Sequence, residues 1–310
     1  MPPNYKNTGG MGVLNGYYFI LFAALGYAIL PILNKIGYQL NMTMDILLTL
    51  RFFIASVILF LILTVTKKHN PRQVKKHLPG LIVQGLLFFG CSYCYTAAVK
   101  YLSASITSIL LHAYPAMVVI IMALFFSEKI DTKKIASLLL SFLGCLMVIN
   151  IFNDPLQLNW KGIAFALGSA LLYAFYNING QYLTAKLEPI AISAYVMLVC
   201  SIATAIVYPP TNLVTASLGV SSWLVGLGTA VVCSVVPTIF YLKGISVLGA
   251  SKSAIVSTIE PALTILLAGV ILGEMLTSVQ LLGGFLIIAG IVILQINKQS
   301  VNYSYSIDTP

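Results

Sequence analysis

Residues 248–274 read LGASKSAIVSTIEPALTILLAGVILGE, and residues 102–128 read LSASITSILLHAYPAMVVIIMALFFSE. A shift of 146 positions places the second stretch on the first without a gap, with Pro115 on Pro261 and Glu128 on Glu274. Each stretch is an apolar run of about 20 residues, the length of a helix that crosses a bilayer. Each also holds a proline near its middle and ends on a glutamate. The chain is therefore predicted to contain one membrane-helix unit twice.

The same offset relates other parts of the two halves. The matched pairs are Gly16 and Gly162, Ala24 and Ala170, Tyr27 and Tyr173, Ala28 and Ala174, Tyr95 and Tyr241, and Gly144 and Gly290. Each half has five apolar runs, and because five is odd, the second half is expected to enter the membrane from the opposite side. Inverted repeats are typical of transporters, whose binding site lies near the midplane beside interrupted helices. A duplication in a non-transporting membrane protein is the alternative.

The composition is that of a polytopic helical membrane protein. Of 310 residues, 59% are apolar and 8% are charged, and the mean hydropathy is +0.96, whereas soluble domains have about 25% charged residues. The longest internal hydrophilic stretch, 67–77, leaves no room for a soluble catalytic domain. The expected fold is all-α, with ten transmembrane helices in two inverted five-helix repeats. The expected spans are roughly 13–33, 44–66, 79–99, 103–126, 134–152, 161–183, 190–208, 222–242, 251–272 and 276–296.

Lysine and arginine set the expected orientation. With the N-terminus inside, 13 of the 17 basic residues lie in inside segments and three lie in outside segments, while Arg51 lies within a span. The positive-inside rule therefore predicts a multi-pass protein of the cell membrane with both termini in the cytoplasm. The net charge of +9 does not indicate nucleic-acid binding, because the basic residues lie at the ends of apolar runs.

Short motifs in both halves resemble those of a known family. They are Tyr114-Pro115-Ala116 followed by Glu128, Glu260-Pro261-Ala262 followed by Gly273-Glu274, last helices with Gly144 or with Gly283, Gly284 and Gly290, and Arg51-Phe52 with Ala55. Their order and spacing resemble the twin EamA domains of the drug/metabolite transporter superfamily, over about residues 12–296. The resemblance implies a ten-helix metabolite transporter, often an exporter. It places the repeats at 13–152 and 161–296 and leaves a cytoplasmic tail at 297–310.

Four prolines are predicted to kink helices, because proline lacks an N–H group and frees the carbonyl four residues earlier. They are Pro31, Pro115, Pro237 and Pro261. Freed carbonyls at membrane depth are tolerable only against protein or a water-lined cavity. Pro115 and Pro261, which would free Leu111 and Ser257, are therefore expected to flank a polar central cavity. A kink satisfied by a neighbouring Ser or Thr is the alternative.

Glu260 lies about ten residues into its apolar run, near the expected midplane. A carboxylate there is costly, so it is expected to face the protein interior and to be functional. Ser253, Ser257 and Thr264 share its helical face. Glu260 is the candidate for proton coupling and for contact with a substrate amine. A structural pairing with Arg51, or a neutral acid bonded to a hydroxyl, is the alternative.

Three other charged residues are assigned structural roles. Arg51 lies about a turn and a half into its span, and it is expected to snorkel outward or to pair with Asp45 or a cavity carboxylate. Glu128 and Glu274 each lie beside the start of the next helix, where the helix dipole stabilises an acid.

Polar and aromatic side chains recur at helical spacing within several runs, and they are the candidates for substrate contact. The candidates are Tyr27, Asn34, Tyr95, His112, Tyr173, Tyr176, Asn177, Tyr241, Ser257 and Glu260. Polar residues also hold membrane helices together, and a lone histidine is more often a hydrogen-bonded packing residue than a proton relay. A structural role is therefore the alternative for each candidate.

These features predict a secondary active transporter, most simply an exporter, that moves a small metabolite by alternating access. One acid, several tyrosines and few cations favour an amino acid or a related amphipathic compound, whose amine would meet Glu260 and tyrosine rings. A sugar-phosphate or nucleotide-sugar, which would need several buried cations, is the alternative within transport, and a membrane interaction protein is the alternative outside it.

P-loop and zinc-protease motifs are absent, so enzymatic activity, cofactors and metals are not expected. The expected partners are the lipid bilayer and a small solute, with possible proton coupling, while the oligomeric state is left open.

Overall fold

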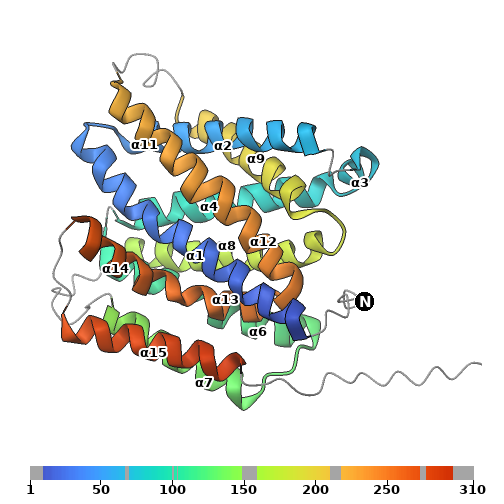
Figure 1. Cartoon of the computed structure of the whole chain (residues 1–310), viewed down its shortest axis with the longest axis vertical. Coiled ribbons are helices and arrows are strands. Elements are labelled where there is room, and N and C mark those ends of the chain that lie inside the picture. The colour runs from blue at the N-terminus through green and yellow to red at the C-terminus, as the bar shows by residue number, and fades with distance from the viewer. Residues whose placement is uncertain are drawn as a thin grey trace, which may run out of the picture.

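The computed structural model describes residues 10–66, 70–99, 101–102, 104–148, 159–209, 218–272 and 277–295, and these ranges contain helices but no strand (Figure 1). The helices of the first half are α1 (Gly10–Gln39), α2 (Met44–Thr66), α3 (Pro71–Lys76), α4 (Leu78–Val99), α5 (Ala104–Leu111), α6 (Tyr114–Phe126) and α7 (Thr132–Val148). Those of the second half are α8 (Trp160–Thr184), α9 (Pro189–Val207), α11 (Val220–Ala230), the π-helix η2 (Val231–Val235), α12 (Val236–Leu248), α13 (Ala250–Val256), the 3₁₀ helix η3 (Ser257–Ile259), α14 (Glu260–Leu272) and α15 (Ser278–Gln295).

Seven helical segments of the described chain are long and apolar enough to cross a membrane. They are α1, α2, α4, α8, α9, the continuous α11–η2–α12 segment and the continuous α13–η3–α14 segment. The other three expected spans are not among these seven. They correspond to α5 and α6 together, to α7 and to α15, so the total of ten membrane crossings stays a prediction. The first helix is longer than expected, because it passes residue 33 and ends at Gln39. The chain turns only at Asn41, whose φ of 59° is left-handed and incompatible with a continued helix.

The outward surface of this helical assembly is apolar. Large hydrophobic side chains such as Val270, Phe125 and Phe285 are 85%, 76% and 66% exposed. A soluble monomer rarely exposes large contiguous apolar patches, whereas lipid tails solvate such side chains without cost. The chain is therefore a multi-pass membrane protein.

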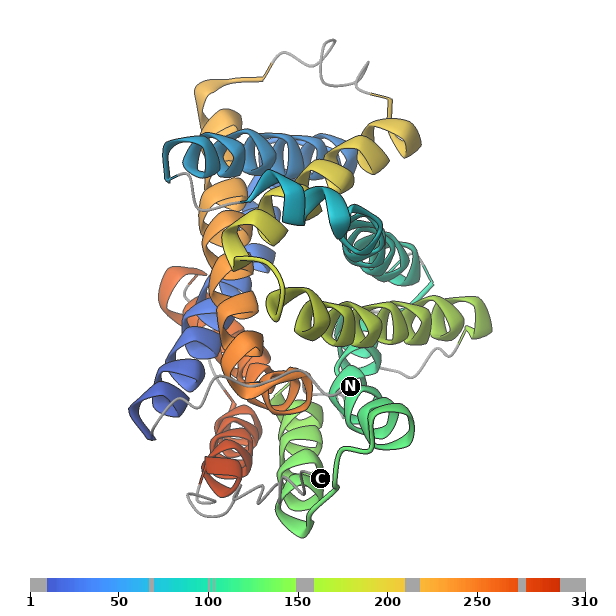
Figure 2. The same cartoon turned by 90° about the vertical axis from the view of Figure 1, so that its right-hand side faces the viewer.

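Helices of the two halves pack on one another instead of forming two separate bundles. In the first half, α1 packs against α12 and α14, and in the second half, α8 packs against α4 and α6. Figures 1 and 2 show α1 lying beside the α11–α12 segment. The 146-residue offset matches α1 with α8, α12 with α4 and α14 with α6. The same helix contacts therefore occur twice.

The correspondence extends to single residues. A Cβ atom on Gly16 of α1 would lie 2.8 Å from side-chain atoms of both Val247 and Leu248. On Gly162 of α8, a Cβ would lie 2.8 Å from Tyr101 and 2.6 Å from Leu102. Every residue of the second contact is the offset mate of one in the first. The contact of α1 with the end of α12 therefore has a counterpart in the contact of α8 with the residues that follow α4.

Helices α7 and α15 form a closely packed pair away from α2 and α9 (Figures 1 and 2). A Cβ on Gly144 would lie 2.6 Å from the carbonyl oxygen of Gly283, and one on Gly290 would lie 2.9 Å from Oγ of Ser141. Only small residues allow helix backbones to approach this closely. The pair packs against the second of the interrupted helices described next, where Cys145 of α7 donates to the Thr258 carbonyl of η3.

Candidate substrate site

Two matched helix interruptions place the first polar groups of the site. Helix α5 ends at Leu111 and α6 begins at Tyr114, while η3 separates α13 from α14, which begins at Glu260. Pro115 and Pro261 lie in the first turns of α6 and α14, where an N–H group has no intrahelical partner. The sequence predicted a freed Ser257 carbonyl, and this detail was wrong. The Glu260 N–H donates to that carbonyl in the 3₁₀ turn.

Tyrosines from four helices gather beside these interruptions. The Tyr173 ring lies 4.6 Å from that of Tyr114, 5.5 Å from that of Tyr176 and 6.3 Å from that of Tyr241, measured between ring centroids. The ring of Tyr27 lies 6.2 Å from that of Tyr241. Helix packing thus brings together four of the sequence-predicted candidates, together with Tyr114, which was named only as the repeat mate of Glu260. We call these five residues the tyrosine cluster.

Hydrogen bonds fix the cluster's orientation. The Tyr241 hydroxyl donates to Oδ1 of Asn177 over 2.6 Å, and Nδ2 of Asn177 donates to the Tyr173 carbonyl over 2.7 Å. The hydroxyls of Tyr114 and Ser257 bond to each other across the two interruptions. Asn177 and Ser257 are buried. Two more predicted candidates therefore belong to the same site, as the groups that orient its tyrosines.

The π-helix η2 holds Arg51. The Arg51 side chain is 7% exposed, its Nε donates to Oγ of Ser234 over 2.7 Å, and its Nη2 donates to the Cys233 carbonyl over 3.4 Å. Its guanidinium carbon lies 5.2 Å from the centre of the Phe52 ring. The arginine is buried against η2 and does not snorkel outward. Pro237 lies in the first turn of α12, directly after η2.

Glu260 is half-buried beside the tyrosine cluster. It begins α14, three residues after Ser257, whose hydroxyl bonds to that of Tyr114. Within the described ranges, no side chain donates a hydrogen bond to its carboxylate, and no ion pair joins it to Arg51.

The remaining candidates lie at the margin of the site. Tyr95 is half-buried on α4. His112 is buried in the turn after α5, its Nδ1 lies 2.8 Å from the Ser108 carbonyl of that helix, and its ring lies 6.3 Å from that of Tyr114. Asn34 is half-buried, two turns along α1 from Tyr27 and outside the tyrosine cluster. Pro31 is exposed within an unbroken α1.

Glu128 links the two halves at the other end of α6. One carboxylate oxygen lies 2.5 Å from Nζ of Lys134, and the other accepts a 2.7 Å hydrogen bond from Ser251 at the start of α13. Sequence reasoning named Glu128 but missed Lys134 and Ser251. Its repeat mate Glu274 lies outside the described residues. In the described part of the chain, no group of three or more His, Cys, Asp or Glu side chains could hold a metal ion.

Comparison with known proteins decides the family. The EamA-like transporter family matches residues 14–150 and again residues 160–296. The chain belongs to the EamA-like transporter family. This confirms the resemblance seen in the duplicated proline and glutamate motifs. Members of the family are transporters and not enzymes, which also confirms the expectation that this EamA-like transporter has no enzymatic activity.

Curated relatives of this EamA-like transporter cover most of its length. The uncharacterized transporter YetK of Bacillus subtilis is 29% identical over 96% of this chain and 92% of its own. An uncharacterized transporter of Archaeoglobus fulgidus is 27% identical over 79% and 86%, respectively. The threonine/homoserine exporter RhtA of Salmonella typhimurium is 25% identical over 86% and 84%. A solved crystal structure shares the fold with a TM-score of 0.76 at 16% identity, covering 93% of this chain and 98% of that one.

Proposed function

We propose that this EamA-like transporter is a secondary active exporter of an amino acid or a related amphipathic metabolite. The observation that carries the proposal is the position of Glu260, which is the first residue of α14 and follows, by three residues, the Ser257 hydroxyl that bonds to Tyr114 of the tyrosine cluster. A membrane-embedded carboxylate is costly unless it has a partner or a function. A protonated amine would satisfy it and would also interact favourably with tyrosine rings. The relative RhtA, which exports threonine and homoserine, supports the same solute class.

Alternating access around this site is the proposed mechanism. Ten crossings in two inverted repeats would place the site between the halves, and rocking one half against the other would open it to each side in turn. The reciprocal contacts of α1 with α12 and of α8 with α4 support this arrangement. The polar groups at the breaks before α6 and α14 support a site at the midplane.

A sugar-phosphate would require a different site. Its phosphate would call for several buried cations, whereas Arg51 is the single arginine within the described membrane spans and is already bonded to η2. We therefore assign the amine-bearing solute to this site.

A metabolite screen tests the proposal. Cells that overproduce the protein should release one or a few amino acids or amphipathic amines at a higher rate than cells with the empty vector. The purified protein in liposomes should move the same solute. Release of sugar-phosphates, or the absence of any transported solute in liposomes, would contradict the proposal.

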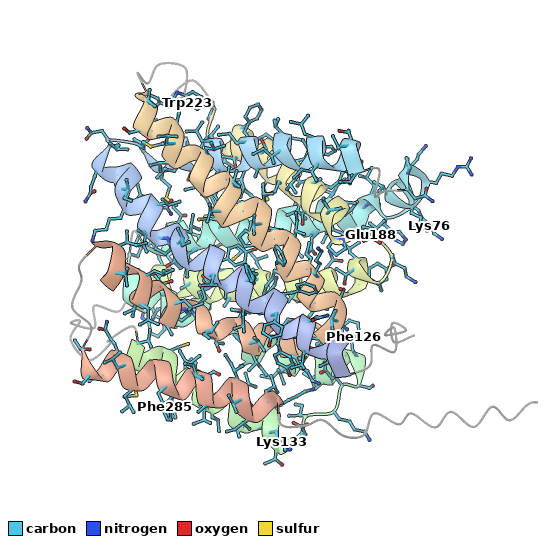
Figure 3. The ribbon with its side chains drawn as sticks, viewed as in Figure 1. Lys76, Phe126, Lys133, Glu188, Trp223 and Phe285 are labelled. Atoms are coloured by element: carbon cyan, nitrogen blue, oxygen red, sulfur yellow. The ribbon has the colours of Figure 1, made fainter. Side chains whose placement is uncertain are left out.

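The proposed orientation places both termini in the cytoplasm. In Figure 3, Lys76, Glu188 and Phe126 lie toward one side of the assembly, and Trp223 lies toward the opposite side. Topology reporters fused after Lys76 and after Lys298 should both report the cytoplasm, because basic residues favour that side. A fusion after Gly219 should report the outside and serves as the control. An outside signal from either of the first two fusions would reverse the orientation.

The break before α14 is expected to be needed for transport. In Pro261→Ala, the new N–H can bond to the Ser257 carbonyl, which would favour an unbroken α-helix and would move Glu260 relative to the Tyr114–Ser257 bond. We expect transport to fall about tenfold with little loss of membrane insertion, measured in liposomes and by the yield of folded protein. Pro189→Ala, at the start of α9 and outside the site, is the matched control. Full transport activity in Pro261→Ala would show that transport does not depend on this proline.

A further inference from the structure

A short helix between α2 and α4 carries a basic surface that takes no part in the candidate substrate site. The stretch 67–77, which separates two helices long enough to cross a membrane, contains no Asp or Glu. Within this stretch, α3 exposes the side chains of Arg72, Lys75 and Lys76. Among the residues that the structure describes, no ion pair joins these three side chains to an acid. Their charges are therefore free to attract an anion.

Local contacts hold α3 at the edge of the assembly (Figure 1). The Asn70 side chain caps the helix by accepting a hydrogen bond from the Arg72 N–H over 3.0 Å. Lys75 and Lys76 lie three and four positions after Arg72, so the three cations share one helical face. Val74, on the opposite face, is 4% exposed and packs in the hydrophobic core. The apolar residue thus anchors α3, and the cations point outward.

The end of α8 brings a fourth cation to the same edge. The centroid of the His77 ring, directly after α3, lies 6.1 Å from that of the Tyr182 ring of α8. A Cβ atom on Gly80 at the start of α4 would lie 3.1 Å from the Leu183 side chain. Lys186 follows in the turn after α8, where its N–H donates to the Leu183 carbonyl over 2.9 Å and its side chain is exposed.

Exposed apolar side chains place α3 at the membrane surface. Leu78, Ile82 and Leu86 recur at four-residue spacing along α4, and all three are exposed. In a multi-pass membrane protein, such an outward apolar face contacts lipid tails. Because α4 begins directly after His77, the cations of α3 lie at the level where lipid headgroups begin. The exposed Tyr182 is of a residue type that is enriched at this level.

The basic edge consists of Arg72, Lys75, Lys76 and Lys186. We propose that the basic edge binds the headgroup of an anionic phospholipid, whose acyl chains lie along the exposed face of α4. Clusters of basic residues beside a membrane helix attract acidic lipids electrostatically. Glu188, two positions after Lys186, is the acid nearest to it along the chain, so cations predominate at this edge and complement an anionic headgroup.

Lipid titration of the purified full-length protein in detergent tests the site. The melting temperature is followed as palmitoyl-oleoyl phosphatidylglycerol, which is anionic, or phosphatidylcholine with the same acyl chains, which is zwitterionic, is added. We expect phosphatidylglycerol to bind at least about tenfold more tightly. This preference should shrink as the salt concentration rises from about 0.05 M to about 0.5 M, because salt screens exposed charges. Equal binding of the two lipids at low salt would overturn the site.

Variants locate the binding. The double variant Lys75→Gln with Lys76→Gln should lose most of the preference for phosphatidylglycerol and, because both side chains are exposed, should fold as wild type does. The matched control is Lys129→Gln with Lys133→Gln, which removes two charges from the segment 127–133, where two acids also lie. The control should keep the preference. An equal loss in both double variants would show a general effect of net charge and would overturn the site.

Inorganic phosphate distinguishes a lipid site from a site for a free anion. At the concentration at which phosphatidylglycerol has its full effect, phosphate should leave the melting temperature unchanged. An increase equal to that given by phosphatidylglycerol would overturn the lipid assignment. Lipid binding is measured without any transported solute, so its failure would leave the proposed export standing, and failure of the proposed export would leave the lipid site standing.

Discussion

Replacing Glu260 with glutamine is expected to lower transport by about two orders of magnitude. The substitution keeps the shape and hydrogen-bonding capacity of the side chain but removes its charge and its exchangeable proton. Truncating one partner of a buried charged contact costs about 2–5 kcal/mol, which corresponds to such a factor. The rate is measured with purified protein in liposomes. Glu188→Gln, at the exposed start of α9, is the matched control and should behave as wild type.

Three results would distinguish the roles of Glu260. Loss of transport with retained binding would identify it as the proton-coupling site. Loss of binding would identify it as the amine contact. Failure to fold unless Arg51 is also neutralised would identify a structural pair, because a charge left buried without its partner is strongly destabilising. Wild-type transport in Glu260→Gln would contradict every functional role proposed for this carboxylate.

The second large effect is expected at the α7–α15 contact. In Gly144→Ala, the added Cβ would lie 2.6 Å from the Gly283 carbonyl oxygen and 2.7 Å from Cγ1 of Ile287, so the helix backbones must separate. Such overpacking costs about 1–3 kcal/mol, and the melting temperature in detergent should fall accordingly. Larger side chains at this position should prevent the pair from forming.

Gly168→Ala supplies the matched control for this prediction. Gly168 also lies in a helix interior, but nothing lies within 4 Å of a Cβ added there. Both substitutions gain about the same helix propensity, up to about 1 kcal/mol, so the difference between them isolates the packing cost. Equal melting temperatures for the two variants would show that α7 and α15 are not held together by this close approach.

Local sequence features predicted the helix breaks, because their causes are local. Proline lacks the N–H group that continues a helix, and Pro115 and Pro261 do lie in the first turns of α6 and α14. The closure of the second break by a 3₁₀ bond from the Glu260 N–H to the Ser257 carbonyl was missed, because this bond depends on the backbone angles of the turn and not on residue type.

The sequence could not predict the environment of Arg51, because the partners of this side chain are distant along the chain. The bonds from Arg51 to Ser234 and Cys233 join residues more than 180 positions apart. A five-residue π-helix has no reliable signature in residue types, although Pro237 marked the neighbourhood as irregular. Without the contact of α2 with η2, outward snorkelling and burial were equally compatible with the apolar run around Arg51.

The sequence by itself determined a helical membrane protein built from one repeated unit, with interrupted helices and a single carboxylate deep in one of them. Hydropathy, proline and charge determine membrane spans, helix breaks and buried charges through local effects, so these features can be predicted from the sequence. Only the tertiary structure decided that Tyr27, Tyr114, Tyr173, Tyr176 and Tyr241 form one cluster and that η2 holds Arg51. These contacts depend on the packing of α1 on α12 and of α8 on α6, where helices of similar apolar composition have many possible partners and only the shapes of their surfaces select one.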